Sequence, residues 1–247
     1  MAPSEAYERV RANLDRVEMR ILRACAKAHR DRDEVTLVAV TKTRSLGEVI
    51  AAHGSSLRHF GENRIEELEA KLPHLRQSLG QDLPMWHMIG HLQSRKASRA
   101  VTLVDLIHSV DSLRLARRLD RGAQEADRVV PVLLQLNVSG EESKYGFDAA
   151  TPEAVDALIP ELAQLEGLSH LDVRGVMTMA PIVADPEEAR PVFVRLRAVR
   201  DRLRHDLAYS DWHDLSMGMT DDFEVAIQEG ATLVRIGRAI FGPRDEG

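Results

Sequence analysis

The chain is poor in cysteine, in aromatic residues and in long apolar stretches, and each shortage excludes a class of protein. Cys25 is the single cysteine, so neither an intrachain disulfide nor a cysteine metal cage can form. Aromatic residues make up 4%, and 39 acidic side chains outnumber 33 basic ones, which disfavours a nucleic-acid-binding surface. No apolar run reaches the roughly 18 residues of a membrane span, and the polar start MAPSEAYERV lacks a signal-peptide core. We therefore expect a soluble, cytoplasmic protein that binds neither nucleic acid nor membrane.

Strand-like apolar runs alternate with helical patterns along the 247 residues. The segment Glu5–Arg30 has apolar residues three or four positions apart, which predicts an N-terminal helix within residues 1–30. Eight apolar runs follow, at Val35–Lys42, Leu57–Gly61, Met85–Gly90, Asp105–Val110, Val129–Ser139, Leu171–Met179, His213–Met219 and Thr232–Gly237. Helical patterns clearly follow seven of the runs, and Asp111 is the expected N-cap of one of these helices.

Strict alternation of buried strands and helices predicts a parallel sheet with right-handed crossovers. Eight such units in a chain of this length favour closure into one (β/α)8 barrel. We expect a single domain over residues 1–247, with the N-terminal helix packing on the barrel. The alternative is an open doubly wound sheet, which normally has a glycine-rich turn after its first strand. That position reads TKTRS here (Thr41–Ser45), which favours the barrel.

In such a barrel the active site lies at the carboxyl ends of the strands. Lys42 ends the most apolar run, VTLVAV. Partial desolvation there would lower the pKa of its amine and suit it to Schiff-base chemistry. The alternative is a strand-end lysine that pairs with a carboxylate such as Glu62.

The last two runs end in residues suited to a phosphate group. Ser216-Met217-Gly218 follows the seventh run, and Gly237-Arg238 follows the eighth and opens a short helical tail. Barrels frequently bind phosphate with these loops and with backbone N–H groups at the start of a short helix. Alternatively, the glycines only make turns. Arg235, inside the apolar run LVRIG, is expected to point inward to an acceptor or to form an ion pair.

A Schiff-base lysine, a phosphate cradle and an inward arginine together describe a pocket for pyridoxal 5′-phosphate (PLP). At these residues the chain resembles the pyridoxal phosphate homeostasis proteins, the YggS/PROSC-like family. Seven motifs carry the resemblance, in order: AVTKT (39–43), HFGENRIEE (59–67), WHMIGHLQSRK (86–96), NVSGEESKYGF (137–147), VRGVMTMAP (173–181), LSMGMTDDFEVAI (215–227) and RIGRAIFG (235–242). They cover nearly the whole chain.

The resemblance implies a single barrel of PLP fold type III, similar to the N-terminal domain of alanine racemase without its second domain. It also implies the cofactor contacts: a Schiff base at Lys42, Asn63 beside the cofactor, Ser216 with the backbone of Gly237 and Arg238 at the phosphate, Arg235 at the pyridine nitrogen, and Met217 and Gly218 lining the pocket. Lys144 is a further amine near the mouth and a candidate second PLP site.

The chemistry of Arg235 favours a carrier over an enzyme. A guanidinium only donates hydrogen bonds, so it leaves the ring nitrogen unprotonated and PLP a weak electron sink. A racemase also needs a second base, and Tyr145 is the only tyrosine in a plausible mouth loop. The leading hypothesis is a monomeric PLP carrier without substantial turnover, with delivery to apo-enzymes as a further role. The alternatives are a weak PLP-dependent amino-acid racemase and a sugar-phosphate aldolase that uses Lys42. We expect no metal site at His87 and His91, because Gly90 breaks any helix between them.

Overall fold

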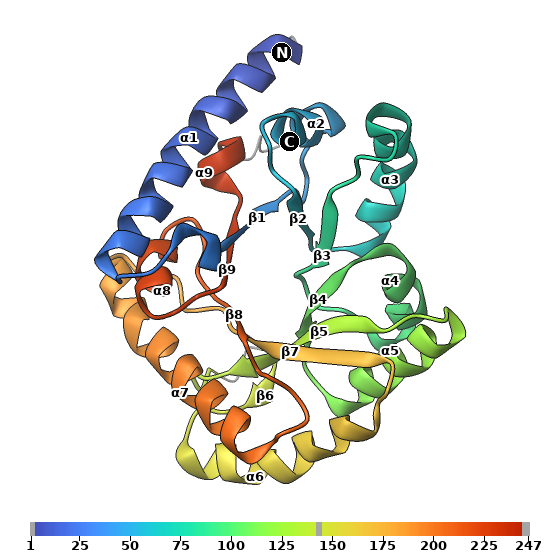
Figure 1. Cartoon of the computed structure of the whole chain (residues 1–247), viewed down its shortest axis with the longest axis vertical. Helices are drawn as coiled ribbons and strands as arrows, with labels where there is room; N and C mark the ends of the chain where they lie inside the picture. The colour runs from blue at the N-terminus through green and yellow to red at the C-terminus, as the bar shows by residue number, and fades with distance from the viewer. Residues whose placement is uncertain (1–2, 142–144, 244–247) are drawn as a thin grey trace.

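Eight parallel strands close into a barrel in the computed structural model, which describes residues 3–141 and 145–243 (Figure 1). The strand order around the ring is β4, β3, β2, β1, β9, β8, β7, β5, and pairing of β4 with β5 closes it. The barrel strands are β1 (Thr36–Val40), β2 (His59–Glu62), β3 (Met85–Met88), β4 (Leu106–Val110), β5 (Val130–Asn137), β7 (Leu171–Met177), β8 (Asp214–Ser216) and β9 (Leu233–Ile236). The prediction of a closed (β/α)8 barrel is confirmed, and the open sheet is wrong.

Helices surround the ring of strands on its outside (Figure 1). The α-helices are α1 (Pro3–Lys27), α2 (Leu46–Gly54), α3 (Ile65–Leu79), α4 (Ala97–Leu103), α5 (Leu113–Glu125), α6 (Pro152–Leu162), α7 (Arg190–Asp206), α8 (Phe223–Gln228) and α9 (Arg238–Phe241). Short 3₁₀ helices lie at Arg32–Glu34, Ser94–Lys96, Ala163–Gly167 and Pro186–Ala189. No helix of the described ranges is both long and apolar enough to cross a membrane.

The structure differs from the sequence-based expectation in two local details. A two-residue strand, β6 (Phe147–Asp148), pairs with the end of β5 and was not predicted. Ser112, not Asp111, is the N-cap of α5, because its side chain accepts the hydrogen bond from the backbone N–H of Leu115. Both residue types suit an N-cap chemically. Ser112 takes this role because it directly precedes Leu113, the first residue of α5.

Strand residues alternate between two buried environments. The side chains on one face of each strand pack outward against the helices and form the main hydrophobic core. The side chains on the other face point into the barrel, where Val38, Leu106, Leu133, Met177 and Leu233 form a separate apolar cluster. Because alternate residues share a face, His108 and Arg235 point inward with Leu106 and Leu233. The barrel interior therefore contains buried polar side chains beside apolar ones.

The N-terminal helix α1 packs along the outside of the barrel against α2, α8 and α9 (Figure 1). Val10, Val17 and Ile21 on its inner face are almost completely buried. Arg30, just after α1, donates hydrogen bonds to the carbonyl of Ile227 in α8 (2.8 Å) and to that of Ala231 (2.9 Å), between α8 and β9. These contacts anchor the helix to the segment that joins the last two barrel strands.

Candidate functional site

Lys42 and the Gly237-Arg238 pair follow neighbouring strands of the barrel. Lys42 is half-buried and comes two residues after β1, and β1 pairs with β9 in a register that aligns Val38 with Arg235. Gly237 lies against β1, since a Cβ built on it would be 3.3 Å from the Cβ of Val40. Barrel closure thus brings the first and last predicted site segments to one side of the mouth.

A buried ionic cluster holds the backbone on both sides of Lys42. The Lys71 Nζ donates to the Thr41 carbonyl (2.8 Å) and to carboxylate oxygens of Glu62 and Glu67 (2.7 Å each). The Thr41 hydroxyl donates to Glu62 (2.7 Å), and the Thr43 N–H donates to Glu67 (2.6 Å). Burial raises the pKa of Glu62, and the neighbouring Lys71 charge opposes that rise. Glu62, the expected alternative partner of Lys42, thus forms its ion pair with Lys71.

Arg235 is a buried cation in the barrel interior. Its side chain is 4% exposed and donates to the Ser216 hydroxyl and to the Thr178 carbonyl (2.9 Å). Its pKa is lowered to about 10 by burial, which the charge of Asp222 opposes, so it stays protonated at neutral pH. No ion pair of Arg235 occurs within the described ranges. The expectation that it points inward to an acceptor is confirmed, whereas the alternative of an ion pair finds no support there.

The residues at the end of β8 and just after it have three different environments. The Ser216 hydroxyl is buried between Arg235 and the Nδ1 of His108 (2.8 Å). Met217 is fully buried within the main hydrophobic core, so only its backbone is available to a ligand at the mouth. Gly218 has φ 91°, and a Cβ there would lie 2.6 Å from the Cβ of Ala226, which only glycine avoids.

Gly237 and Arg238 begin α9, as the sequence indicated. The Arg238 guanidinium is exposed and pairs with Asp221, which leaves the backbone of this turn as its contribution to an anion site. On the other side of β1, Asn63 follows β2 and lines a cavity of about 280 Å³ with His91 and Lys96. Gly90 permits this arrangement, because a Cβ on it would lie 2.5 Å from the carbonyl oxygen of Asn63.

Sequence reasoning missed a row of histidines. His59, His87 and His108 occupy inward positions on β2, β3 and β4 and form hydrogen bonds with one another. The alternation of side chains along each strand could have predicted that these three histidines face inward. It could not have predicted that their rings contact one another. His91 lies apart from the row, stacks on Tyr145 with ring centroids 4.1 Å apart, and pairs with Asp111 at 3.0 Å.

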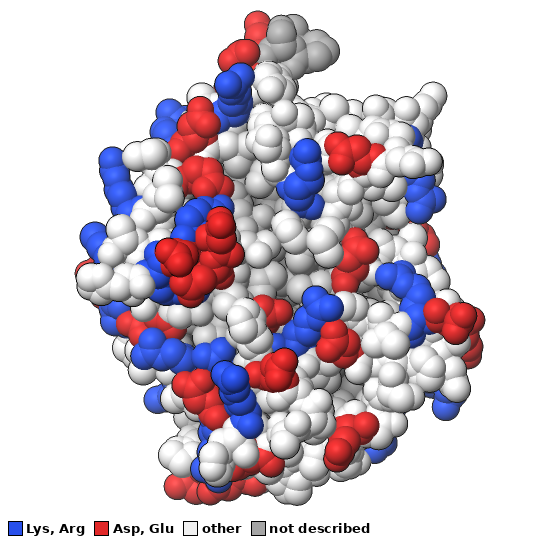
Figure 2. Space-filling view, viewed as in Figure 1, with Lys and Arg blue, Asp and Glu red and all other residues white. Residues whose placement is uncertain are grey.

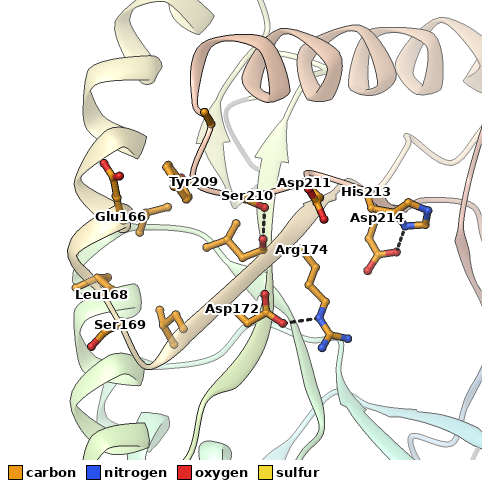
Figure 3. Close-up of a pocket in the computed structure, with 14 residues that line it drawn as sticks. Glu166, Leu168, Ser169, Asp172, Arg174, Tyr209, Ser210, Asp211, His213 and Asp214 are labelled. Atoms are coloured by element: carbon orange, nitrogen blue, oxygen red, sulfur yellow. Dashed lines mark hydrogen bonds and ion pairs between the residues drawn. The ribbon is translucent and has the colours of Figure 1, made fainter.

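Other parts of the molecule add little to the predicted site. No metal-binding cluster of His, Cys, Asp or Glu is found among the described residues, and Lys144, the candidate second PLP site, lies outside them. A separate pocket of about 720 Å³ lies at the amino ends of β7 and β8, away from the predicted site residues (Figure 3). Its polar side chains pair locally, as in Arg174 with Asp172 (2.7 Å). Acidic and basic side chains are interspersed on the face of the molecule in Figure 2.

The interior of the barrel fits one kind of ligand atom well. A buried guanidinium whose described acceptors are a hydroxyl and a carbonyl can donate to an uncharged acceptor without losing a carboxylate partner. A pyridine nitrogen is such an acceptor. The nearby lysine and the helix start at Gly237 supply an amine and backbone donors, so the residues present fit PLP.

The comparisons with known proteins agree with this geometry. The alanine racemase N-terminal domain family matches residues 12–245. The Clostridium difficile alanine racemase in complex with cycloserine has a TM-score of 0.70 at 15% identity, over 97% of this chain and 60% of that one. The barrel is therefore of PLP fold type III.

Closer relatives define the family. Pyridoxal phosphate homeostasis proteins of Pseudomonas aeruginosa and Aquifex aeolicus are 41% and 39% identical, over 95% and 94% of this chain and 96% of each relative. PipY of Synechococcus elongatus, solved with PLP bound, has a TM-score of 0.77 and 36% identity over 90% of this chain and 100% of that one. The chain belongs to the pyridoxal phosphate homeostasis protein family, which confirms the resemblance.

Proposed function

We propose that this protein binds PLP in the barrel mouth and serves PLP homeostasis. The observation that carries the proposal is Arg235, a buried cation with uncharged acceptors on the strand next to the one that leads to Lys42. That PipY, a homologue of the same fold, has been solved with PLP bound supports it.

Each predicted residue has one part in this proposal. Lys42 holds the aldehyde as a reversible Schiff base, and the cluster of Lys71, Glu62 and Glu67 fixes the backbone around it. Arg235 donates to the pyridine nitrogen and keeps it unprotonated. Bound PLP supplies an electrophilic aldehyde and, with that nitrogen unprotonated, only a weak electron sink.

The remaining contacts surround the ring and the phosphate. Asn63 lies beside the ring, and the backbone of Gly218, Gly237 and Arg238 cradles the phosphate. Met217 contributes its backbone alone, since its side chain is in the core. Ser216, which the resemblance placed at the phosphate, orients Arg235, because its buried hydroxyl contacts the guanidinium.

A carrier fits this site better than a racemase. The only tyrosine near the mouth within the described residues, Tyr145, is 57% exposed and its ring stacks on His91. In this proposal the carrier is a cytoplasmic monomer. It releases PLP to apo-enzymes, which is chemically feasible because a Schiff base is exchangeable. Racemisation of an amino acid by the purified protein at about 1–1000 per second, the ordinary enzyme range, would contradict this.

Absorbance and lysine mapping test the proposal. The wild-type protein mixed with PLP is expected to show a Schiff-base absorption band, which borohydride reduction converts into a stable label on Lys42. Lys42→Ala removes the band, whereas Lys27→Ala, at an exposed position on α1, leaves it unchanged. A band that survives in Lys42→Ala, or a label confined to other lysines, would overturn the assignment.

A further inference from the structure

A continuous chain of side-chain hydrogen bonds runs through the barrel interior. The His59 Nδ1 is 3.0 Å from the His87 Nε2, and the His87 Nδ1 is 2.8 Å from the His108 Nε2. The His108 Nδ1 is 2.8 Å from the Ser216 hydroxyl, which also accepts from Arg235. The chain thus leads from the first residue of β2 to the last residue of β8 and ends on the buried cation.

The two inner histidines of this chain are neutral. His87 is 2% exposed and His108 is fully buried. Burial lowers the pKa of His87 to about 3, and the pKa of His108 lies well below its usual value for the same reason. A neutral imidazole has one N–H and one lone pair, so each ring donates on one side and accepts on the other. The row of hydrogen bonds can therefore run in only two directions: every ring donates toward Ser216, or every ring donates away from it.

Counting hydrogens selects one direction. Arg235 only donates, so the Ser216 oxygen accepts from it and the Ser216 hydrogen needs an acceptor of its own. The two side-chain partners of the Ser216 hydroxyl in the described part of the chain are Arg235 and His108. If His108 donated to Ser216, the hydroxyl hydrogen of Ser216 would be buried without an acceptor. The free-energy cost of this is a large part of that of a lost hydrogen bond.

We propose that His59, His87 and His108 form an ordered relay in which every ring has its hydrogen on Nε2, and that this relay holds Arg235 in place through Ser216. Ser216 donates to His108, His108 donates to His87, and His87 donates to His59. His87 and His108 are positioning residues for the cation.

The direction of the relay also stabilises the cation electrostatically. Each ring presents its lone pair toward Arg235 and its N–H away from it, so the aligned dipoles have their negative end at the guanidinium. At the far end, the negative charge of Asp105 acts on His59. The negative charge of Asp222 also acts on Arg235, but the two form no ion pair in the described ranges. An ordered row of dipoles thus takes the place of a carboxylate partner.

This arrangement keeps Arg235 available as a donor. A carboxylate beside the guanidinium would occupy its N–H groups and compete with a ligand for them. The relay occupies one N–H through Ser216, and Thr178 occupies another. The role of Arg235 toward a pyridine nitrogen rests on the proposed function, whereas the direction of the relay does not.

Imidazole ¹⁵N NMR of the full-length protein without PLP tests the direction. His87 and His108 are expected to show a protonated Nε2 and an unprotonated Nδ1, unchanged between about pH 5 and pH 8. A proton on the Nδ1 of either ring, or a doubly protonated ring in this range, would overturn the relay. The result stands whether or not the protein binds PLP.

Variants test the positioning role. His108→Leu removes the acceptor of the Ser216 hydrogen and is expected to weaken PLP binding roughly five- to hundredfold and to shift the absorption maximum of the bound form. The matched control is His53→Leu, a buried histidine on α2 outside the relay, which leaves both unchanged. An unchanged spectrum and affinity in a folded His108→Leu protein would show that the relay does not position Arg235. Absence of PLP binding in the wild type would instead refute the proposed function.

Discussion

Lys71 is the residue on which the geometry around Lys42 depends most directly. It neutralises the buried carboxylate of Glu62 and holds the Thr41 carbonyl. Lys71→Met leaves Glu62 buried without its cation, so we expect a loss of about 3–5 kcal/mol in the free energy of unfolding. Urea titration measures this loss, and the double variant Lys71→Met/Glu62→Gln should recover most of it. A single variant as stable as the wild type would show that the ion pair does not anchor the Lys42 segment.

The buried histidines make the stability of the protein depend on pH. In the unfolded chain a histidine binds a proton below about pH 6.5, whereas burial lowers the pKa of His87 to about 3 in the folded protein. The unfolded state therefore binds more protons between these values. Within this range, His87 lowers the free energy of unfolding by roughly 1.4 kcal/mol for each unit that the pH falls. Glu62 acts in the opposite direction, because its folded pKa is raised and protonation below that value favours the folded state.

The slope of this dependence isolates one histidine. Between about pH 6 and pH 5, the free energy of unfolding is expected to fall less steeply with decreasing pH in His87→Gln than in the wild type. The difference in slope corresponds to about one fewer proton taken up on unfolding. His74→Gln, at an exposed position on α3, serves as the control and keeps the wild-type slope. Denaturant titration at several pH values gives both slopes. Equal slopes in His87→Gln and the wild type would mean that His87 titrates normally in the folded protein.

At the scale of elements, α1 supports the short helix that begins at Gly237. The Asn13 side chain donates to the Ile240 carbonyl (2.8 Å), and Arg9 donates to the Phe241 carbonyl (3.0 Å). These bonds help to satisfy carbonyls at the end of α9, which have no acceptor role within so short a helix. The N-terminal helix therefore fixes the segment to which we assign the phosphate.

Asn13→Ala tests this support. We expect a loss of about 0.5–1.5 kcal/mol in the free energy of unfolding and weaker PLP binding, because α9 loses one of its anchors. Arg11→Ala changes an exposed position of the same helix and should alter neither quantity. Thermal unfolding and PLP titration measure the two effects. Weaker PLP binding in both variants alike would remove the specific link between α1 and α9.

The elements were largely predictable, and the reason lies in their burial. Strands covered on both faces read as continuous apolar runs, so each of the eight predicted runs overlaps a barrel strand. The two-residue strand β6 was missed because Phe147 and Asp148 form no such run. Among single site residues, Lys42, Gly237 and Arg235 were predicted from their place at strand ends or within an apolar run. The role of Lys71 in the site was missed, because its position in the sequence pattern of α3 is that of any lysine on a helix.

At the scale of the whole molecule, barrel closure creates contacts that no local pattern contains. His59, His87 and His108 come from three strands, and Ser216 is 108 residues beyond His108. Each of them looks ordinary in its own run. Their contact depends on the register between strands and on the pairing of β4 with β5 that closes the ring. The sequence therefore indicates which residues face inward, but the closed barrel alone shows which of them touch.

Because the proposed site draws on the first and last barrel strands, PLP should stabilise the entire fold. At a hundred times its dissociation constant, a ligand of the folded state adds about 2.7 kcal/mol to the free energy of unfolding. For a chain of this size that corresponds to a rise of roughly 5–10 °C in the melting temperature. Pyridoxal, which lacks the phosphate, should give a clearly smaller rise at the same concentration because it cannot use the backbone donors after β8 and β9. Calorimetry of the wild-type protein measures both, and equal rises would rule out the phosphate cradle at Gly237.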